Sequence, residues 1–371
     1  MTEGAARDPL LAGLRDPASL LSLEDPNWPT LLVRARNGAL LAKLACLLRG
    51  RGLLERVPEA ARRQLEAAMV IGERNQVTLC FEADRIARTL APLEVPVVLL
   101  KGSAYIVADL PAKAGRTAGD VDILVPRSAL AAVEAALLSA GWKSAALSPY
   151  DERYYRTWMH EIPPLNHSKR DVVTDVHHSI APMTARYQPD AEGLLAAAIP
   201  LGKSPLHVLC PADMVLHSAA HLLNEEMLGP TLRDLADLHD LLTDFGERPG
   251  YWDSLLDRAG RHGLERPLYY AVTLCHELLG TVVPPEMRAR VQSLAPPVPI
   301  NSLMLSAFSV ALPPPSPGRI RPAATAARGL LYLRSHWLKM PPLLLARHLA
   351  TKAWMNCRAT FGAPRAKPEA H

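Results

Sequence analysis

The chain has 371 residues, of which 49% are apolar and 21% charged, so it can bury one large core or two ordinary ones. Its formal net charge of +4 is too small to indicate a nucleic-acid partner without a concentrated basic patch. The five cysteines are isolated and form no CxxC pair, which argues against a disulfide framework or cysteine-based zinc site and indicates a reducing, cytoplasmic compartment.

The N-terminal part of the chain is predicted to be helical. The opening sequence MTEGAARDPLLAGLRDP carries acidic residues and no long apolar run, so it does not resemble a signal peptide. No stretch of about 18 uncharged apolar residues predicts a membrane span. Residues 31–50 and 58–90 have apolar residues at three- and four-residue spacing. We therefore expect an N-terminal helical region over 1–90.

A small α/β core is expected over residues 91–200. The run VPVVLLK (95–101) and the run GDVDILVP (119–126) are short, apolar and rich in β-branched residues, which is typical of buried strands. Residues 128–142 then predict an amphipathic helix, with Ser128 as its N-cap. The fold class predicted from these elements is α+β, with helical regions on both sides of the core.

The remaining segments complete the predicted domain organisation. TWMHEIPPL (157–165) and DVVTDVHHSI (171–180) are separated by a polar turn and predict an antiparallel hairpin. A helical domain is expected over 201–281 and an irregular proline-rich linker over 282–323. The segment 324–371 is basic, apolar and helical; packing on the core is favoured, and peripheral membrane contact through 324–358 is the alternative.

Three aspartates carry the expected chemistry. Asp120 and Asp122 are two residues apart in a predicted strand, so their carboxylates project from the same face. Asp175 lies on the predicted hairpin, within the run VVTDVH. Carboxylates held this close repel unless a cation lies between them, and Mg²⁺ prefers carboxylate oxygens. The sequence therefore predicts a site for one or two Mg²⁺ ions, with Asp175 as general base.

A phosphate-binding turn is predicted next to these aspartates. The first strand leads directly into Gly102 and Ser103, and a strand–helix junction of this kind offers backbone N–H groups to an anion. Lys101 and Arg116 are the nearest candidate counter-charges.

The motifs LKGSAY, GRTAGDVDILV and TDVHHSI resemble the nucleotidyltransferase superfamily, which has the fold of DNA polymerase beta. More closely, they resemble a bacterial family of uncharacterised nucleotidyltransferases found with exopolysaccharide and peptide-modification gene sets. The matching residues are Leu100-Lys101-Gly102, Arg116, Asp120-Val121-Asp122 and Asp175-Val176-His177. Sixteen residues separate Ser103 from Asp120, more than in compact members of the superfamily, so the nucleotide pocket is expected to be reshaped.

This resemblance implies a small mixed-sheet nucleotidyltransferase core and an Mg²⁺-dependent transfer of an NMP group from an NTP such as ATP. The acceptor implied is a sugar, a metabolite, a peptide or an RNA end, in polysaccharide or peptide-modification pathways. Low net charge disfavours a nucleic acid but leaves tRNA open. His177 is expected either to contact the triphosphate or to pack as a hydrogen-bonded histidine. The alternative function is a catalytically inactive nucleotide-binding or assembly protein that uses the same pocket.

Other polar residues have simpler interpretations. His217 and His221 have the spacing of a zincin pair, but HSAAH lacks the glutamate of HExxH, so core or capping histidines are favoured. Arg233, Asp234 and Asp237 could help to recognise an acceptor, but ordinary pairing along a helix is the simpler explanation. His160 and Glu161 lie on the predicted partner strand and could approach the aspartates.

Overall fold

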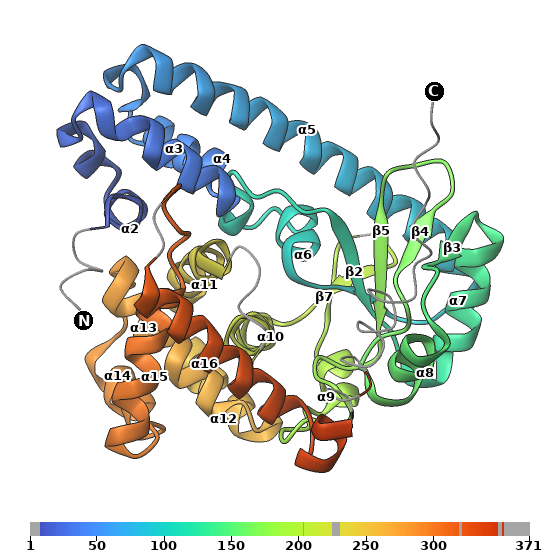
Figure 1. The fold of residues 1–371 in the computed structure, drawn as a ribbon. Coiled ribbons are helices and arrows are strands. Elements are labelled where there is room, and N and C mark those ends of the chain that lie inside the picture. The colour runs from blue at the N-terminus through green and yellow to red at the C-terminus, as the bar shows by residue number, and fades with distance from the viewer. Residues whose placement is uncertain (1–7, 203, 225–230, 319–320, 348–350, 352–371) are drawn as a thin grey trace, which may run out of the picture.

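A computed structural model describes residues 8–202, 204–224, 231–318, 321–347 and 351 (Figure 1). Within these residues one mixed sheet has the strand order β3-β4-β5-β2-β1-β7-β6. Its central pair consists of β2 and β5, which run parallel, and β2 pairs with β1 in the antiparallel direction. The strands are β1 (Val97–Leu99), β2 (Asp120–Leu124), β3 (Trp142–Ser144), β4 (Leu165–His167), β5 (Val173–His177), β6 (Ile199–Pro200) and β7 (Leu206–Val208).

Helices enclose this sheet and make up most of the described chain, as the predicted α+β class requires (Figure 1). The helices before and within the sheet are α2 (Pro9–Arg15), α3 (Trp28–Asn37), α4 (Leu41–Gly50), α5 (Glu59–Leu90), α6 (Lys101–Val107), α7 (Leu130–Ser139), α8 (Pro149–Trp158) and α9 (Ala191–Ala196). Those after it are α10 (Pro211–Asn224), α11 (Thr231–Gly246), α12 (Tyr251–His262), α13 (Glu265–Leu274), α14 (Pro285–Gln292), α15 (Val298–Ala311) and α16 (Pro322–Lys339).

Helix α5 joins the N-terminal helices to the sheet. Figure 1 shows it running from α3 and α4 toward α7, and it packs on α4, α6, α7 and β2. Its buried face includes Leu65, Leu79 and Ile86, at the helical spacing expected from the sequence. Helix α5 therefore links the N-terminal helices to the strand that carries Asp120 and Asp122.

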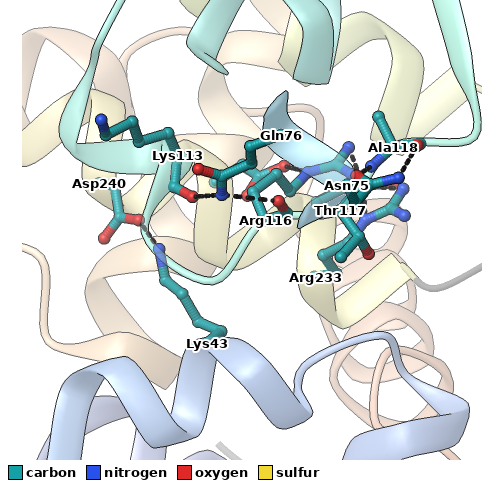
Figure 2. Close-up of polar contacts among 11 residues, drawn as sticks. Lys43, Asn75, Gln76, Lys113, Arg116, Thr117, Ala118, Arg233 and Asp240 are labelled. Atoms are coloured by element: carbon teal, nitrogen blue, oxygen red, sulfur yellow. Dashed lines mark hydrogen bonds and ion pairs between the residues drawn. The ribbon is translucent and has the colours of Figure 1, made fainter. Parts of the chain in front are cut away.

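The loop before β2 is held by side chains of α5 (Figure 2). The Asn75 side chain donates to the Ala118 carbonyl and accepts from the Ala118 N–H, both at 2.9 Å. Gln76 donates to the carbonyls of Lys113 and Arg116. Gly115 has φ +66, and a Cβ there would lie 2.3 Å from the Lys43 backbone nitrogen, so only glycine allows this approach to α4. The expected insertion between Ser103 and Asp120 is thus firmly anchored.

The predicted hairpin is only partly correct. Residues 157 and 158 end helix α8, whose start is fixed by the Ser148 side chain accepting from the Asp151 N–H. The first strand is shortened to β4, because Pro163 and Pro164 before it have no N–H for a strand ladder. Antiparallel pairing of β4 with β5 is as predicted.

Two other predictions differ from the structure. The segment 282–323 contains α14 and α15, because its prolines lie at the first turns of helices, where a missing N–H costs no hydrogen bond. The helix predicted from Ser128 is preceded by a 3₁₀ turn (Arg127–Ala129), and Ser128 makes no capping bond. The boundaries of the five predicted regions remain a proposal.

The last described helix, α16, packs on α15 and α10, which agrees with the favoured interpretation that this segment packs on the core. Arg334 donates to the Leu223 carbonyl, and Arg186 lies over the Trp337 ring at 4.2 Å. No helix in the described part of the chain is both long and apolar enough to cross a membrane. Residues 348–350 and 352–371 of the predicted basic C-terminus lie outside the described residues.

Candidate functional site

The three predicted aspartates meet at the centre of the sheet. Strands β2 and β5 are parallel and in register, with Asp122 opposite Asp175 and Asp120 opposite Val173. One carboxylate oxygen from each of Asp120, Asp122 and Asp175 lies within 4.8 Å of the others. The predicted convergence of the three carboxylates is therefore present in the structure.

Strand alternation explains why they converge. Val121 and Ile123 are fully buried on the opposite face of β2, and Val176 is fully buried on that face of β5. This apolar anchoring turns the aspartates toward the other face, where Asp122 is buried and Asp120 and Asp175 are half-buried. A register slip of one residue would bury the carboxylates among apolar side chains.

Lys101 provides the nearest positive charge. Its Nζ lies 3.3 Å from Asp122 Oδ1, and its backbone has φ +48, a left-handed conformation uncommon for a residue with a side chain. Burial alone would lower the pKa of Lys101, but Asp122, Glu161 and Asp120 raise it above its usual value. Lys101 therefore stays charged and balances part of the acidic cluster.

Asp122 is also bonded to His177. His177 Nε2 lies 3.0 Å from Asp122 Oδ1, and its Nδ1 lies 3.3 Å from Glu161 Oε2. Burial opposes ionisation of Asp122, yet Lys101 and His177 hold its pKa well below the usual range. Burial would likewise lower the pKa of His177, but Glu161 and Asp122 raise it. Asp122 is thus an ionised carboxylate with two protein partners.

Asp175 is in the opposite situation. Burial, together with the charges of Asp122 and Glu161, raises its pKa to about 7, and its Oδ1 is buried without a hydrogen-bond partner. Burial and Asp122 also raise the pKa of Asp120. Excess negative charge and an unsatisfied carboxylate oxygen are what a bound cation would relieve, and an all-oxygen donor set suits Mg²⁺. The residues present therefore fit the predicted metal.

Three other predicted nucleotide-binding residues, Gly102, Ser103 and Arg116, are buried. Ser103 is buried, and its hydroxyl donates to the Leu100 carbonyl at 2.7 Å. Arg116 is buried too, with Nε 2.7 Å from Asp237 Oδ2 and a second contact of 3.9 Å to Asp234. A Cβ on Gly102 would lie 3.1 Å from the Arg116 guanidinium carbon, so Gly102 leaves room for that side chain. Nucleotide binding by these residues stays a prediction.

Helix α11 brings a further cation toward the site. Arg233 lies near enough to Asp120 to lower its pKa, against the larger effect of burial, and it pairs with Asp234. Lys101, Arg116, Arg233 and His221 are among the residues that line a cavity of about 30 Å³. In the sequence, the only indication that Arg233 belongs to the site was its position close to Asp234 and Asp237. Ion pairing along one helix explained that pattern equally well.

Two groups within the described residues can hold a metal: the acidic triad, and a neighbouring group of His160, Glu161 and His177. His217 and His221 belong to neither group. His160 and Glu161 do approach the aspartates, because Glu161 forms a bridge with His177 of β5.

Comparison with known proteins adds one finding. A family model described as uncharacterised nucleotidyltransferase matches residues 24–280, more than two thirds of the chain. The matched range includes α5, the whole sheet and helices α10 to α13. No curated protein and no solved structure matches the chain significantly.

Proposed function

Because the chain belongs to the uncharacterised nucleotidyltransferase family, we propose that it transfers an NMP group from an NTP to an acceptor in an Mg²⁺-dependent reaction. The observation that carries this proposal is the convergence of three carboxylates from two adjacent strands, with oxygens within 4.8 Å of one another. A protein that only bound a nucleotide would need fewer acidic ligands, so the complete triad favours the enzyme over the inactive alternative.

Asp120, Asp122 and Asp175 would hold the metal, one or two ions of Mg²⁺. When bound, Mg²⁺ neutralises charge on the triphosphate and on the departing pyrophosphate. Asp122 is kept ionised by Lys101 and His177, so it is ready to bind without losing a proton. Asp175 is also the candidate to accept the proton of the attacking acceptor group.

The triphosphate is proposed to lie along the polar side chains that border the triad. Lys101 and His177 contact Asp122 on the sheet side, and Arg233 approaches Asp120 from α11. The role proposed for Gly102, Ser103 and Arg116 is indirect. Ser103 holds the turn that contains Lys101, and Arg116, for which Gly102 leaves room, holds helix α11 in position. The acceptor is proposed to be a sugar, a metabolite, a peptide or an RNA end.

Calorimetry of NTP binding tests the proposal. We expect wild-type protein to bind at least one NTP in the presence of Mg²⁺ and not with chelator, and the Asp120→Asn/Asp122→Asn double variant to lose this binding. Asp171→Asn is the matched control, because Asp171 is exposed just before β5 and outside both groups that can hold a metal. If folded wild type binds no NTP, or the double variant binds as well as wild type, the proposal is wrong.

Metal affinity is expected to depend on pH through Asp175. A proton competes with the cation for this carboxylate below its pKa of about 7. The affinity for Mn²⁺, used as a probe for Mg²⁺, should therefore fall about tenfold per pH unit below 7 and level off above it. Asp175→Asn should bind Mn²⁺ more weakly and without this dependence. A titration from pH 8 to pH 5.5, followed by the relaxation of solvent protons, measures both, and a pH-independent wild type would contradict the assignment.

A further inference from the structure

The second group of possible metal ligands, His160, Glu161 and His177, lies beside the triad but differs in chemistry. Its nearest ligand atoms, one from each residue, are within 4.8 Å of one another. Two imidazoles and one carboxylate form a donor set that suits Zn²⁺ and related ions, whereas Mg²⁺ prefers oxygen ligands alone.

The backbone around this group is fixed by strand-like bonds. Glu161 and His177 form an antiparallel bridge, so their side chains share one face. The Ile162 N–H donates to the Val176 carbonyl at 3.0 Å, and the His178 N–H donates to the His160 carbonyl at 2.8 Å. Residues 160–162 are therefore bonded to the end of β5 that carries His177.

The hydrogen bonds of His177 leave one ring nitrogen facing a carboxylate. Asp122 can only accept, so the Nε2 of His177, 3.0 Å away, must carry the hydrogen. The other ring nitrogen of His177, Nδ1, lies 3.3 Å from Glu161 Oε2. His177 Nδ1 and His160 Nδ1 are both buried without a hydrogen-bond partner. Two buried imidazole nitrogens without hydrogen-bond partners, beside a carboxylate, offer ligand atoms to a cation.

The spacing suits a metal of ordinary Zn²⁺ geometry. Zn²⁺ lies about 2.0–2.2 Å from imidazole nitrogen and carboxylate oxygen, which places two ligands of a tetrahedron about 3.4 Å apart. The separation between His177 Nδ1 and Glu161 Oε2 is 3.3 Å. A metal-bound histidine also typically donates its other N–H to a carboxylate, as His177 does to Asp122.

We propose that His160 Nδ1, His177 Nδ1 and the Glu161 carboxylate bind a transition-metal ion of the Zn²⁺ class, with a fourth ligand that is not a protein side chain. Asp122 orients His177 for this site while it also belongs to the acidic triad. The ion would act as a positioning element, because it fixes the ring that Asp122 contacts. The proposal stands apart from nucleotidyl transfer, since it concerns a separate ion with separate ligands.

Zinc binding by the metal-free protein tests the site directly. After removal of metals with a chelator, calorimetry with Zn²⁺ should show a tight site in wild type. His160→Ala should weaken it more than about 100-fold, beyond the ten- to hundredfold typical of changes outside the ligand set. His178→Ala is the matched control, because His178 is the next histidine along the chain and belongs to neither group; it should bind like wild type. Asp120→Asn replaces one carboxylate of the acidic triad, and this variant should bind Zn²⁺ like wild type.

Several results would overturn the proposal. Folded wild type that binds no Zn²⁺ would mean that His177 instead carries a proton toward Glu161. Binding lost in Asp120→Asn but kept in His160→Ala would place the ion in the acidic triad. If His160→Ala does not fold, Co²⁺ bound to wild type decides: strong visible absorption indicates four-coordinate binding with imidazole and supports the site, whereas faint absorption indicates an oxygen-only octahedral site and contradicts it. These readouts need neither an NTP nor an acceptor.

Discussion

Replacement of Asp122 by asparagine is expected to lower the rate of pyrophosphate release from the preferred NTP by at least about 10³-fold, which corresponds to ~4 kcal/mol of transition-state free energy. Asp122 is the one aspartate of the triad whose pKa lies far below its usual range, so it is charged at any physiological pH. Lys101 and His177 both contact its Oδ1. The neutral amide would weaken metal binding and disturb both partners at once.

The measurement is NTP- and Mg²⁺-dependent pyrophosphate release, with the acceptor supplied from candidate mixtures of sugars, metabolites, peptides and RNA. Asp171→Asn is again the control and should keep the wild-type rate. Circular dichroism and thermal unfolding establish that Asp122→Asn is folded. A folded Asp122→Asn variant with the wild-type rate would exclude the triad as the catalytic centre, whatever the acceptor.

Local patterns were sufficient to predict the two strands that carry the three aspartates. Val121 and Ile123 alternate with Asp120 and Asp122, and this period of two determines which side chains face the core. The Asp175 strand follows the same logic, and its register beside Asp122 comes from burying Val176 on the core face. The triad is therefore a local consequence of sequence, once the two strands are adjacent.

The contacts that complete the site were not predictable in this way. Lys101 meets Asp122 across 21 residues, and Arg116 meets Asp237 across 121. No periodicity links residues so far apart, and the acidic positions of α11 are equally consistent with pairing along one helix. The proline-rich segment shows the same limit, because proline permits a helix at its first turn and forbids it in the interior. Tertiary packing decides between such alternatives.

Arg116→Met is expected to lower the free energy of unfolding by about 3–5 kcal/mol, the usual cost of removing one partner of a buried ion pair. Arg116 and Asp237 have side chains only 7% and 4% exposed, and the Arg116 Nε lies 2.7 Å from the Asp237 carboxylate. Loss of the guanidinium leaves Asp237 without its buried counter-charge. It also removes a contact that ties the loop before β2 to helix α11.

Chemical denaturation of three proteins separates this effect from simple loss of packing. Arg116→Met/Asp237→Leu should recover much of the stability, because neither charge is then buried without its partner. Arg156→Met is the matched control: Arg156 is 43% exposed and pairs with Glu134 and Glu152 at the surface, so its loss should cost less than about 1 kcal/mol. If Arg116→Met costs no more than Arg156→Met, the Arg116 guanidinium is not structural, and it becomes available for the triphosphate as the sequence motif implies. A large loss that the double variant restores would instead make Arg116 the residue that holds α11, and with it Arg233, against the acidic triad.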